Sequence, residues 1–270
     1  MMKGLASLPM TAVHGGGRVP ALRALPEEVP VSVVCHGSSQ AVMMCSPSDL
    51  EDFATGFCLT EGIVQAPGEI ETLEVVPHEL GTELRMWLRP DRAEALGARR
   101  RMMAGPVGCG MCGLDSLDQA MRSLPVVVSD LRFGVEEIAG APDALRARQP
   151  MHDRARAVHA AGFMVPGQGI VMAREDVGRH NALDKLIGAL ARGGVDPASG
   201  AAVLTSRVSV EMVQKCAVAG IPVVVAVSAP TALAVRMAEG AGLTLACFAR
   251  EGGFDLWSGP ERIAGGADVA

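Results

Sequence analysis

The chain has 270 residues, of which 49% are hydrophobic, 20% are charged and 3% are aromatic, and its formal net charge is −6. This negative charge argues against a surface built to bind nucleic acid, and no stretch reaches the roughly 18 consecutive apolar residues of a membrane-spanning helix. The seven cysteines are odd in number and follow no signal sequence, so we expect a cytoplasmic protein without disulfide bonds.

The first part of the chain predicts a flexible lead-in over residues 1–26 and then a small α+β domain over 27–130. The lead-in is rich in glycine and proline and has no periodic pattern. In the domain, short apolar runs predict strands: 29–34, 41–45, 70–76 and 84–88. Apolar residues at helical spacing predict helices: 50–58, 91–103 and 114–123. Ser48 and Glu51 fit a capping box at the start of the first helix.

The second part, residues 131–270, predicts an α/β domain with a mostly parallel sheet. Two weak helical patterns between Asp130 and Asp153 bridge the two parts. Beyond them, continuous apolar runs predict buried strands: 170–173, 201–204, 223–227 and 243–248. Helical patterns alternate with these runs: 179–192, 208–219 and 231–239. Such alternation is typical of βαβ crossovers with a sheet buried on both faces.

Polar or glycine-containing segments follow the predicted strands of this domain: Arg174–Asn181, Thr205–Ser209, Ser228–Thr231 and Phe248–Gly253. Ligands of such sheets bind beyond the carboxyl ends of the strands. The segment 174–181 is the most polar, and we expect part of a binding site there. The alternative is an exposed helix start capped by Asp176. Within it, His180 fits either a general base or a hydrogen-bonded structural residue.

The strongest local motif is the pair Cys109 and Cys112, in a loop that has four glycines between residues 105 and 113. Three arginines at 99–101 precede the loop and a predicted helix follows it. Positive charge and a helix N-terminus both favour a thiolate near neutral pH. A thiolate that takes up a sulfur atom, with the second cysteine releasing it by intramolecular attack, uses every feature of the segment.

Other chemistries share this cysteine spacing. Half of a zinc site is one, although the remaining cysteines are singletons without a histidine at ligand spacing. A redox dithiol is another, although it would open a helix directly after a short strand. The glycines 108, 110 and 113 match a dinucleotide-binding fingerprint, although arginines and a proline stand where its first strand belongs. These alternatives stay open on the cysteine motif alone.

The residues after His159 exclude a zinc deaminase. The deaminase signature places a glutamate two residues after the histidine, with a cysteine pair further on that binds the metal. Position 161 is alanine, and no second cysteine pair occurs beyond it. No phosphate-binding P-loop pattern occurs either.

Three long motifs resemble the FdhD family of formate dehydrogenase accessory sulfurtransferases: Gly108–Gly113, Glu175–Asn181 with Asp184 and Lys185, and Ser228–Val235. Shorter matches lie nearer the N-terminus: Glu28–Pro30, Pro47-x-Asp49-Leu50 and Glu61–Ile63. The resemblance covers about residues 27–263. It implies a cytidine-deaminase-like C-terminal domain and a homodimer.

The resemblance also implies a function. The protein would be a sulfur carrier required for formate dehydrogenase activity, which takes sulfur from a cysteine desulfurase as a cysteine persulfide. It would pass this sulfur to the molybdenum cofactor, in its bis-molybdopterin guanine dinucleotide form, before insertion into formate dehydrogenase. The rival interpretation is a cofactor-binding chaperone whose cysteines hold zinc or only shape the loop.

Site residues are carried over by position. Cys109 would bear the persulfide, and Cys112 would assist it. The family's cofactor-binding stretch falls on six consecutive residues: Phe248, Ala249, Arg250, Glu251, Gly252 and Gly253. A guanine nucleotide is expected to mimic half of the cofactor there, and no resident metal is expected.

Overall fold

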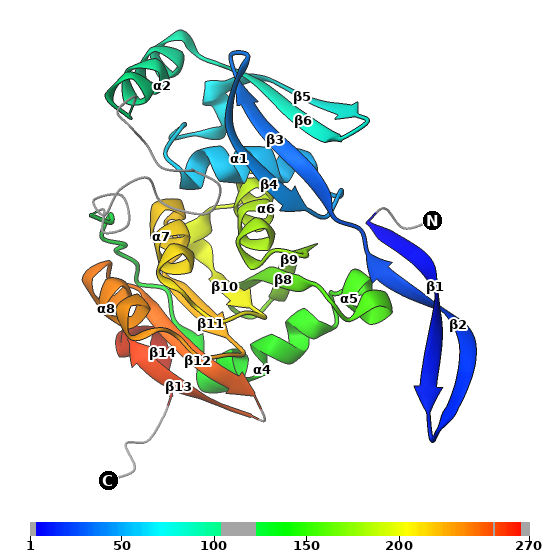
Figure 1. Cartoon of the computed structure of the whole chain (residues 1–270). Helices are drawn as coiled ribbons and strands as arrows, with labels where there is room; N and C mark the ends of the chain where they lie inside the picture. Colours follow the sequence, from blue (N-terminus) through cyan, green and yellow to red (C-terminus); the bar gives the residue numbers. More distant parts are fainter. Residues whose placement is uncertain (1–3, 104–122, 251, 266–270) are drawn as a thin grey trace.

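The structure is a computed structural model that describes residues 4–103, 123–250 and 252–265, with the backbone alone for 99–103 (Figure 1). The predicted glycine loop with Cys109 and Cys112, and all but the last residue of the helix predicted over 114–123, lie outside the described residues. In the part of the chain that is described, no helix has the length and apolar character needed to cross a membrane.

The chain begins with a long β-hairpin, which we call the arm. Strand β1 (Leu5–His14) pairs antiparallel with β2 (Gly17–Pro26) along its whole length. The prediction of a lead-in without regular structure is therefore wrong for residues 5–26. Gly15 and Gly16 make the turn with φ of 55° and 82°, which glycine adopts at little cost. The arm could not be predicted from the sequence because most of its side chains are exposed. Its strands therefore show no alternation of apolar and polar residues.

The N-terminal domain is a four-stranded sheet in the order β4-β3-β6-β5, and α1 packs on one of its faces. Its predicted strands and helices are confirmed: β3 (Val29–Cys35), β4 (Ser38–Cys45), α1 (Leu50–Thr60), β5 (Ile70–His78), β6 (Gly81–Leu88) and α2 (Pro90–Met103). The predicted capping box at Ser48 is wrong. Asp49 is the N-cap, with a φ of 52° and no side-chain capping bond, because its carboxylate turns toward Arg174, 3.7 Å away.

The C-terminal domain is a six-stranded sheet in the order β13-β12-β11-β10-β8-β9. Its strands are β8 (His159–Val165), β9 (Gly169–Asp176), β10 (Ala201–Leu204), β11 (Val223–Ala226), β12 (Thr244–Arg250) and β13 (Gly253–Ser258). Strands β9 to β12 all run in one direction and β8 and β13 in the other, although only β10, β11 and β12 pair in parallel. The prediction of a mostly parallel sheet thus holds for strand direction and not for strand pairing.

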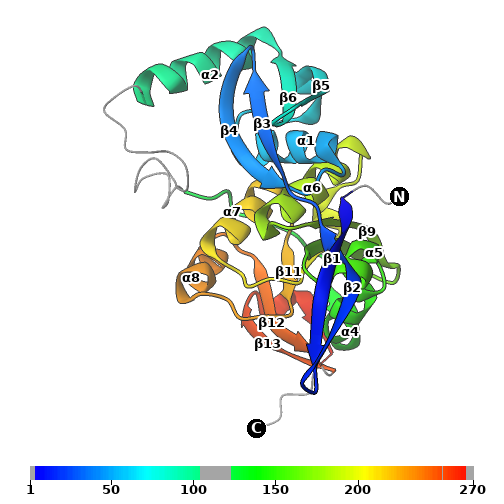
Figure 2. The same ribbon diagram turned by 45° about the vertical axis from the view of Figure 1, so that its right-hand side comes forward.

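Helices cover both faces of this sheet, which gives the predicted α/β fold (Figures 1 and 2). One face carries α6 (Arg179–Arg192), α7 (Val210–Ala219) and α8 (Ala232–Gly240) over one apolar core. The other face carries α4 (Val135–Arg146) over a second core, and α5 (Pro150–Ala155) follows α4. The short elements are β7 (Phe133–Gly134), β14 (Ile263–Ala264), η1 (Pro67–Glu69), η2 (Pro197–Ser199) and η3 (Pro260–Arg262). The stretch expected to bridge the domains therefore belongs to the C-terminal domain.

The two domains meet where α1 crosses α6, and two glycines let the helix backbones touch. A Cβ atom added to Gly56 would overlap the carbonyl group of Asp184, and one added to Gly188 would overlap the carbonyl group of Asp52. Any side chain at either glycine would push the helices apart. This close packing holds the two domains in one fixed arrangement.

Candidate functional site

Strands β9, β10, β11 and β12 end at one edge of the C-terminal sheet, and β8 begins there. The four polar segments predicted at strand ends follow one another along this edge. Val208 N donates to Ala229 O at 3.1 Å, and Phe248 N lies 3.4 Å from Ser228 O. The sequence-based expectation of a common edge is confirmed, and we call this edge the rim.

Beneath the rim, Asp176 and Lys185 form a fully buried ion pair, with Oδ2 and Nζ 2.6 Å apart. Both bind the backbone of Ser46 at the end of β4: Ser46 N donates to Asp176 Oδ2 (3.0 Å), and Lys185 Nζ donates to Ser46 O (2.9 Å). Asn181 Nδ2 also donates to Met44 O, at 2.7 Å. The ion pair therefore fastens the N-terminal domain to α6. Asp176 is a buried interdomain residue, and the exposed cap considered for it is wrong.

A second buried ion pair begins at the residue before Lys185 on α6: Asp184 pairs with Lys215 of α7. Lys215 Nζ lies 2.9 Å from Asp184 Oδ1 and 3.0 Å from Thr60 Oγ1, at the end of α1. Burial raises the pKa of Asp184 despite the nearby ammonium group. Burial opposes the charge of Lys215, but Asp184 and Glu61 beside it raise its pKa. We call these two ion pairs the anchor pairs, because each joins the two domains.

The other early residues of the segment 174–181 are also structural. Arg174 Nη2 lies 2.8 Å from Asp52 Oδ2 on α1. Glu175 accepts two backbone hydrogen bonds at the start of α5, from Met151 N (2.7 Å) and His152 N (2.8 Å). The polar residues in this half of the segment therefore hold neighbouring elements together and do not bind a ligand.

The other half of the segment opens onto the rim. Arg179 and His180 begin α6 beside Glu211 in the first turn of α7, and His159 begins β8 with its Nδ1 3.5 Å from the hydroxyl of Thr205. We call these five residues the rim cluster. Two of its buried atoms, Arg179 Nε and His180 Nε2, have no hydrogen-bond partner in the described parts of the chain. Buried donors and acceptors are rarely left unpaired in proteins, so this cluster is the best candidate for a ligand site.

The rim cluster carries charges of both signs: the guanidinium group of Arg179, and the carboxylate of Glu211, whose pKa is lowered, against the effect of burial, by hydrogen bonds. Burial lowers the pKa of His180 to about 4, and the charges of Arg179 and Lys215 act in the same direction. Burial and Arg179 also lower the pKa of His159. Both imidazoles are thus neutral at pH 7, while the N-termini of α6 and α7 and the guanidinium group supply positive potential. In the described residues, no three His, Cys, Asp or Glu side chains come together as a metal site would need.

The stretch expected to bind the cofactor forms the turn between β12 and β13. Phe248 has a φ of 53°, at an irregularity in the strand register. Ala249 is fully buried in the core under α4, so its side chain faces away from the rim. Arg250 is exposed at the end of β12, and Gly252 and Gly253 are exposed beyond it. Glu251 lies outside the described residues.

The five cysteines that the structure describes are all buried, and none of them is in a disulfide bond: Cys35, Cys45, Cys58, Cys216 and Cys247. Burial raises the pKa of Cys216 and of Cys247 to about 12, and burial also raises the pKa of Cys45. A hydrogen bond with Cys35, together with burial, raises the pKa of Cys58. Such thiols are neither accessible nor ionised at neutral pH, so they are unsuited to nucleophilic chemistry. The predicted catalytic pair, Cys109 and Cys112, lies outside the described residues.

Sequence reasoning identified the segments of the rim but not the residues that matter within them. It gave Glu211 no role. The available signal was that two helices begin directly after the carboxyl ends of strands that share one edge, which places their first turns together. Only the folded chain shows that Arg174, Glu175 and Asp176 are bonded to other elements, while Arg179 and His180 each keep a buried nitrogen atom without a hydrogen-bond partner in the described residues.

Comparisons with known proteins agree with this architecture. The family model described as FdhD/NarQ matches residues 26–264. The chain is 49% identical over 255 residues to the sulfur carrier protein FdhD of Agrobacterium fabrum, covering 94% of each chain. It is also 49% identical to the protein of that name from Xanthomonas campestris pv. campestris strain B100, covering 95% of this chain and 92% of the other.

A solved structure has the same fold. The crystal structure of a formate dehydrogenase accessory protein from Desulfotalea psychrophila matches with a TM-score of 0.76 and 23% identity, covering 96% of this chain and 99% of the other. The match to the family model and the two relatives at 49% identity show that the chain belongs to the FdhD/NarQ family.

Proposed function

We propose that this protein is a sulfur carrier for formate dehydrogenase and that Cys109 and Cys112 carry out its sulfur chemistry. The names of its relatives support a sulfur-carrier role. The assignment to these two residues rests on the burial and the pKa values of the other five thiols. Five of the seven cysteines are buried with raised pKa values or in buried thiol contacts, which leaves the pair in the glycine-rich motif.

The proposed uptake step is a thiol exchange with the persulfide of a cysteine desulfurase. The thiolate of Cys109 attacks the terminal sulfur of the donor persulfide. A new S–S bond forms on Cys109 while the donor's S–S bond breaks, and the donor cysteine leaves as a thiolate. Sulfur transfer of this kind needs no external oxidant or reductant.

The proposed release step uses the second cysteine. The thiolate of Cys112 attacks Sγ of Cys109, the bond to the terminal sulfur breaks, and hydrosulfide passes to the acceptor. The two cysteines are left as a disulfide, which a cellular dithiol reduces by exchange. We further propose that this takes place in the cytoplasm, ahead of insertion of the cofactor into formate dehydrogenase.

The rim is the proposed holding site for the sulfur acceptor, the bis-molybdopterin guanine dinucleotide form of the molybdenum cofactor. Its dinucleotide parts bring phosphate oxygens, which are acceptors for the unpaired Nε–H of Arg179 and fit the helix N-termini beside it. Arg250 extends this positive surface at the end of β12. Within the predicted stretch 248–253, the backbone and the exposed Arg250 would contact the cofactor, and the buried side chain of Ala249 would not.

Sulfur loading tests the role of the cysteine pair. Wild type incubated with a cysteine desulfurase and cysteine should gain cyanide-labile sulfur, and the double variant Cys109→Ala with Cys112→Ala should not. Zinc analysis of the same samples separates the rival chaperone. Near-stoichiometric zinc that disappears with both cysteines, without sulfur loading of wild type, would favour that rival.

Nucleotide binding tests the role of the rim. Guanosine diphosphate should bind wild type, and Arg179→Ala and Arg250→Ala should each weaken its affinity about tenfold or more, the effect of losing a hydrogen bond to a charged group. Arg132→Ala, at an exposed arginine away from the rim, is the matched control. Equal affinities for all four proteins would remove the nucleotide from the rim.

A further inference from the structure

Three sulfur atoms meet in the core of the N-terminal domain, between its sheet and α1. Cys58 on α1 places its Sγ 3.6 Å from Sδ of Met86 on β6, and its thiol donates to this thioether. Cys58 also has a hydrogen bond with Cys35, the last residue of β3. Because Cys58 contacts both other residues, we call the three together the sulfur cluster.

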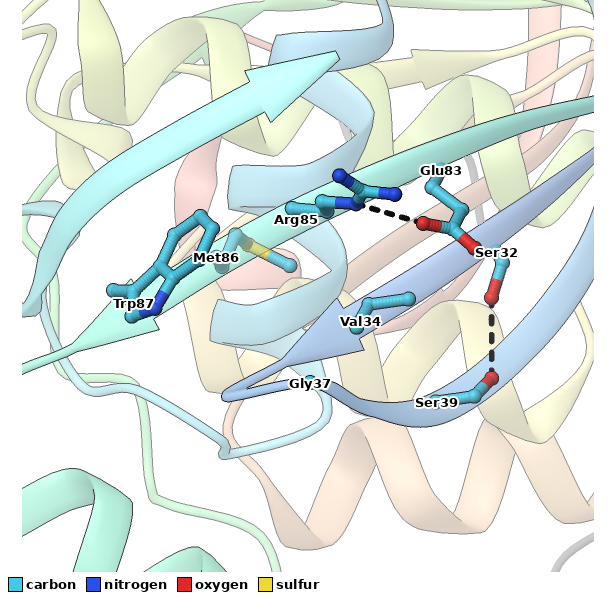
Figure 3. A pocket seen from close by; sticks show the side chains of 8 residues that line it. All are labelled: Ser32, Val34, Gly37, Ser39, Glu83, Arg85, Met86 and Trp87. Carbon is cyan, nitrogen blue, oxygen red and sulfur yellow. Dashed lines mark hydrogen bonds and ion pairs between the residues drawn. The ribbon is translucent and has the colours of Figure 1, made fainter. Parts of the chain in front are cut away.

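The register of the sheet sets two corners of this cluster. Cys35 and Met86 are direct partners on the parallel strands β3 and β6, so their side chains lie next to each other. Figure 3 shows the opposite face of these strands, where Val34, Arg85 and Trp87 line a cavity of about 360 Å³. Side chains alternate between the two faces of a strand, so Cys35 and Met86 face α1.

The surroundings of the sulfur cluster are dry and carry negative potential. Cys35, Cys58 and Met86 are 1%, 0% and 1% exposed within the apolar core of this domain. The hydrogen bond with Cys35, burial, and the charges of Asp184 and Glu61 all raise the pKa of Cys58. A potential that holds the proton on a thiol also favours another positive ion in the place of that proton.

The donor atoms indicate which ion this is. Thiol and thioether sulfurs are soft ligands, which select Cu(I). Zn²⁺ takes four ligands, but no His, Asp or Glu of the described residues joins the two thiols in a group of three. We propose that the sulfur cluster is a binding site for a soft monovalent cation, Cu(I), held by Cys35, Cys58 and Met86.

The spacing of the sulfurs fits such an ion. A metal–sulfur bond is about 2.3 Å long, which places three sulfurs around a central ion about 4.0 Å apart. The distance between Cys58 Sγ and Met86 Sδ is 3.6 Å, so this pair needs to separate by only about 0.4 Å. The flexible side chain of methionine accommodates a change of this size.

The charge balance also favours a monovalent ion. When Cu(I) binds, one S–H bond breaks, an S–Cu bond forms, and the proton leaves to solvent, with no change in oxidation state. Because the ion replaces a proton of equal charge, the buried core gains no charge. A divalent ion would have to displace both thiol protons and would still lack a fourth ligand. The inference does not rest on the sulfur-carrier role, so failure of either proposal leaves the other standing.

Copper retention by the full chain tests the site. Cys109 and Cys112 are first replaced by alanine, because a second pair of thiols would bind Cu(I) as well. This background protein is incubated without oxygen with Cu(I) supplied as its acetonitrile complex, and unbound metal is removed by gel filtration. We expect one copper ion per chain.

Single variants in this background locate the ion. Cys58→Ala should raise the dissociation constant for Cu(I) at least about 100-fold, because loss of a ligand costs more than loss of a group behind one. Met86→Leu keeps the volume of the side chain and should raise the constant about tenfold, because the thioether is the weakest ligand. Cys216→Ala is the matched control, a buried cysteine on α7, and should stay within about threefold of the background protein.

Thermal unfolding shows whether the folded chain binds the ion. A ligand of the folded state raises the unfolding midpoint, by about 5 °C at a free concentration about 100 times the dissociation constant. Cu(I) should therefore raise the midpoint of the background protein and leave that of Cys58→Ala unchanged. The midpoint without copper shows that each variant folds. A midpoint that Cu(I) lowers would mean that only the unfolded chain binds it, which overturns the proposal.

Two further results would overturn it. One is a background protein that retains no copper, and the other is equal retention by the background protein, Cys58→Ala and Met86→Leu. X-ray absorption at the copper edge then checks the ligands, and we expect three sulfur neighbours at about 2.3 Å. Nitrogen or oxygen neighbours, or only two sulfurs, would contradict the three-sulfur site.

Discussion

The motif 174–181 contains two regions that look alike in sequence and differ in the folded chain. Its first half reaches inward, where Asp176 is paired with Lys185 and bound to the backbone of β4. Its second half begins α6 at the rim, where Arg179 Nε and His180 Nε2 have no hydrogen-bond partner in the described residues, although Glu211 Oε2 lies 3.9 Å from His180 Nε2. The contrast teaches that hydrogen-bond pairing, and not polarity, separates the residues that hold the domains together from those open to a ligand.

The largest expected effect comes from breaking an anchor pair. Lys185→Met leaves the carboxylate of Asp176 buried without its counterion, and we expect unfolding free energy to fall by about 3–5 kcal/mol. Urea denaturation measures it. Arg146→Met is the matched control, since its pair with Asp153 is exposed and should contribute less than about 1 kcal/mol. Similar losses for both variants would mean that the anchor pairs do not hold the domains together.

The next effect concerns the glycine crossing of α1 and α6. Gly56→Ala adds a methyl group that overlaps the carbonyl group of Asp184, and we expect a loss of about 1–3 kcal/mol from overpacking. Gly140→Ala is the control, because nothing lies within 4 Å of its added Cβ on α4. That variant should be neutral or up to about 1 kcal/mol more stable. Equal stability of the two variants in denaturant titrations would contradict the close helix crossing.

An effect of similar size, confined to acid pH, is expected from the rim cluster. His180 has a pKa of about 4 in the folded protein, whereas an unfolded histidine titrates near 6.5. The unfolded chain therefore binds the proton first, and this group lowers stability as pH falls from about 6.5 to about 4. Relative to His180→Gln, wild type should lose about 3 kcal/mol across this window and no more below it. A constant difference from pH 7 to pH 4 would show that His180 is not held neutral.

The smallest effect on stability is expected at the other rim residue. Arg179→Met removes a buried donor that has no partner in the described residues, so unfolding free energy should change by less than about 0.5 kcal/mol or rise. The same variant should weaken binding of guanosine diphosphate. A loss of stability as large as that of Lys185→Met would place Arg179 with the anchor residues instead of the site.

Much of the fold was predictable because the helices and strands that build its cores carry regular patterns of apolar residues. The helix over 179–192 and the strand over 201–204 match the structure at both ends. Strand β8 was missed because its Ala-Ala-Gly run lacks β-branched residues, and β13 because it lies at the exposed edge of the sheet. Alternation is visible only where one face of a strand is buried and the other is not.

The site was less predictable than the fold. The polar density of 174–181 was visible, but the partners that decide its meaning lie far away in sequence: Ser46 and Asp176 are 130 residues apart, and Arg174 and Asp52 are 122 apart. Such pairings come from the packing of α1 on α6. Local sequence could indicate that the segment matters but not which of its residues remain open.

The central claim is that sulfur is carried by the cysteine pair and not by the buried thiols. Peptide mass spectrometry after incubation with a cysteine desulfurase and cysteine tests it most directly. We predict an added sulfur atom on the peptide with Cys109 and Cys112 and none on the peptides with Cys35, Cys45, Cys58, Cys216 or Cys247. Added sulfur on any of those five, or undiminished loading of the double variant Cys109→Ala with Cys112→Ala, would contradict the account.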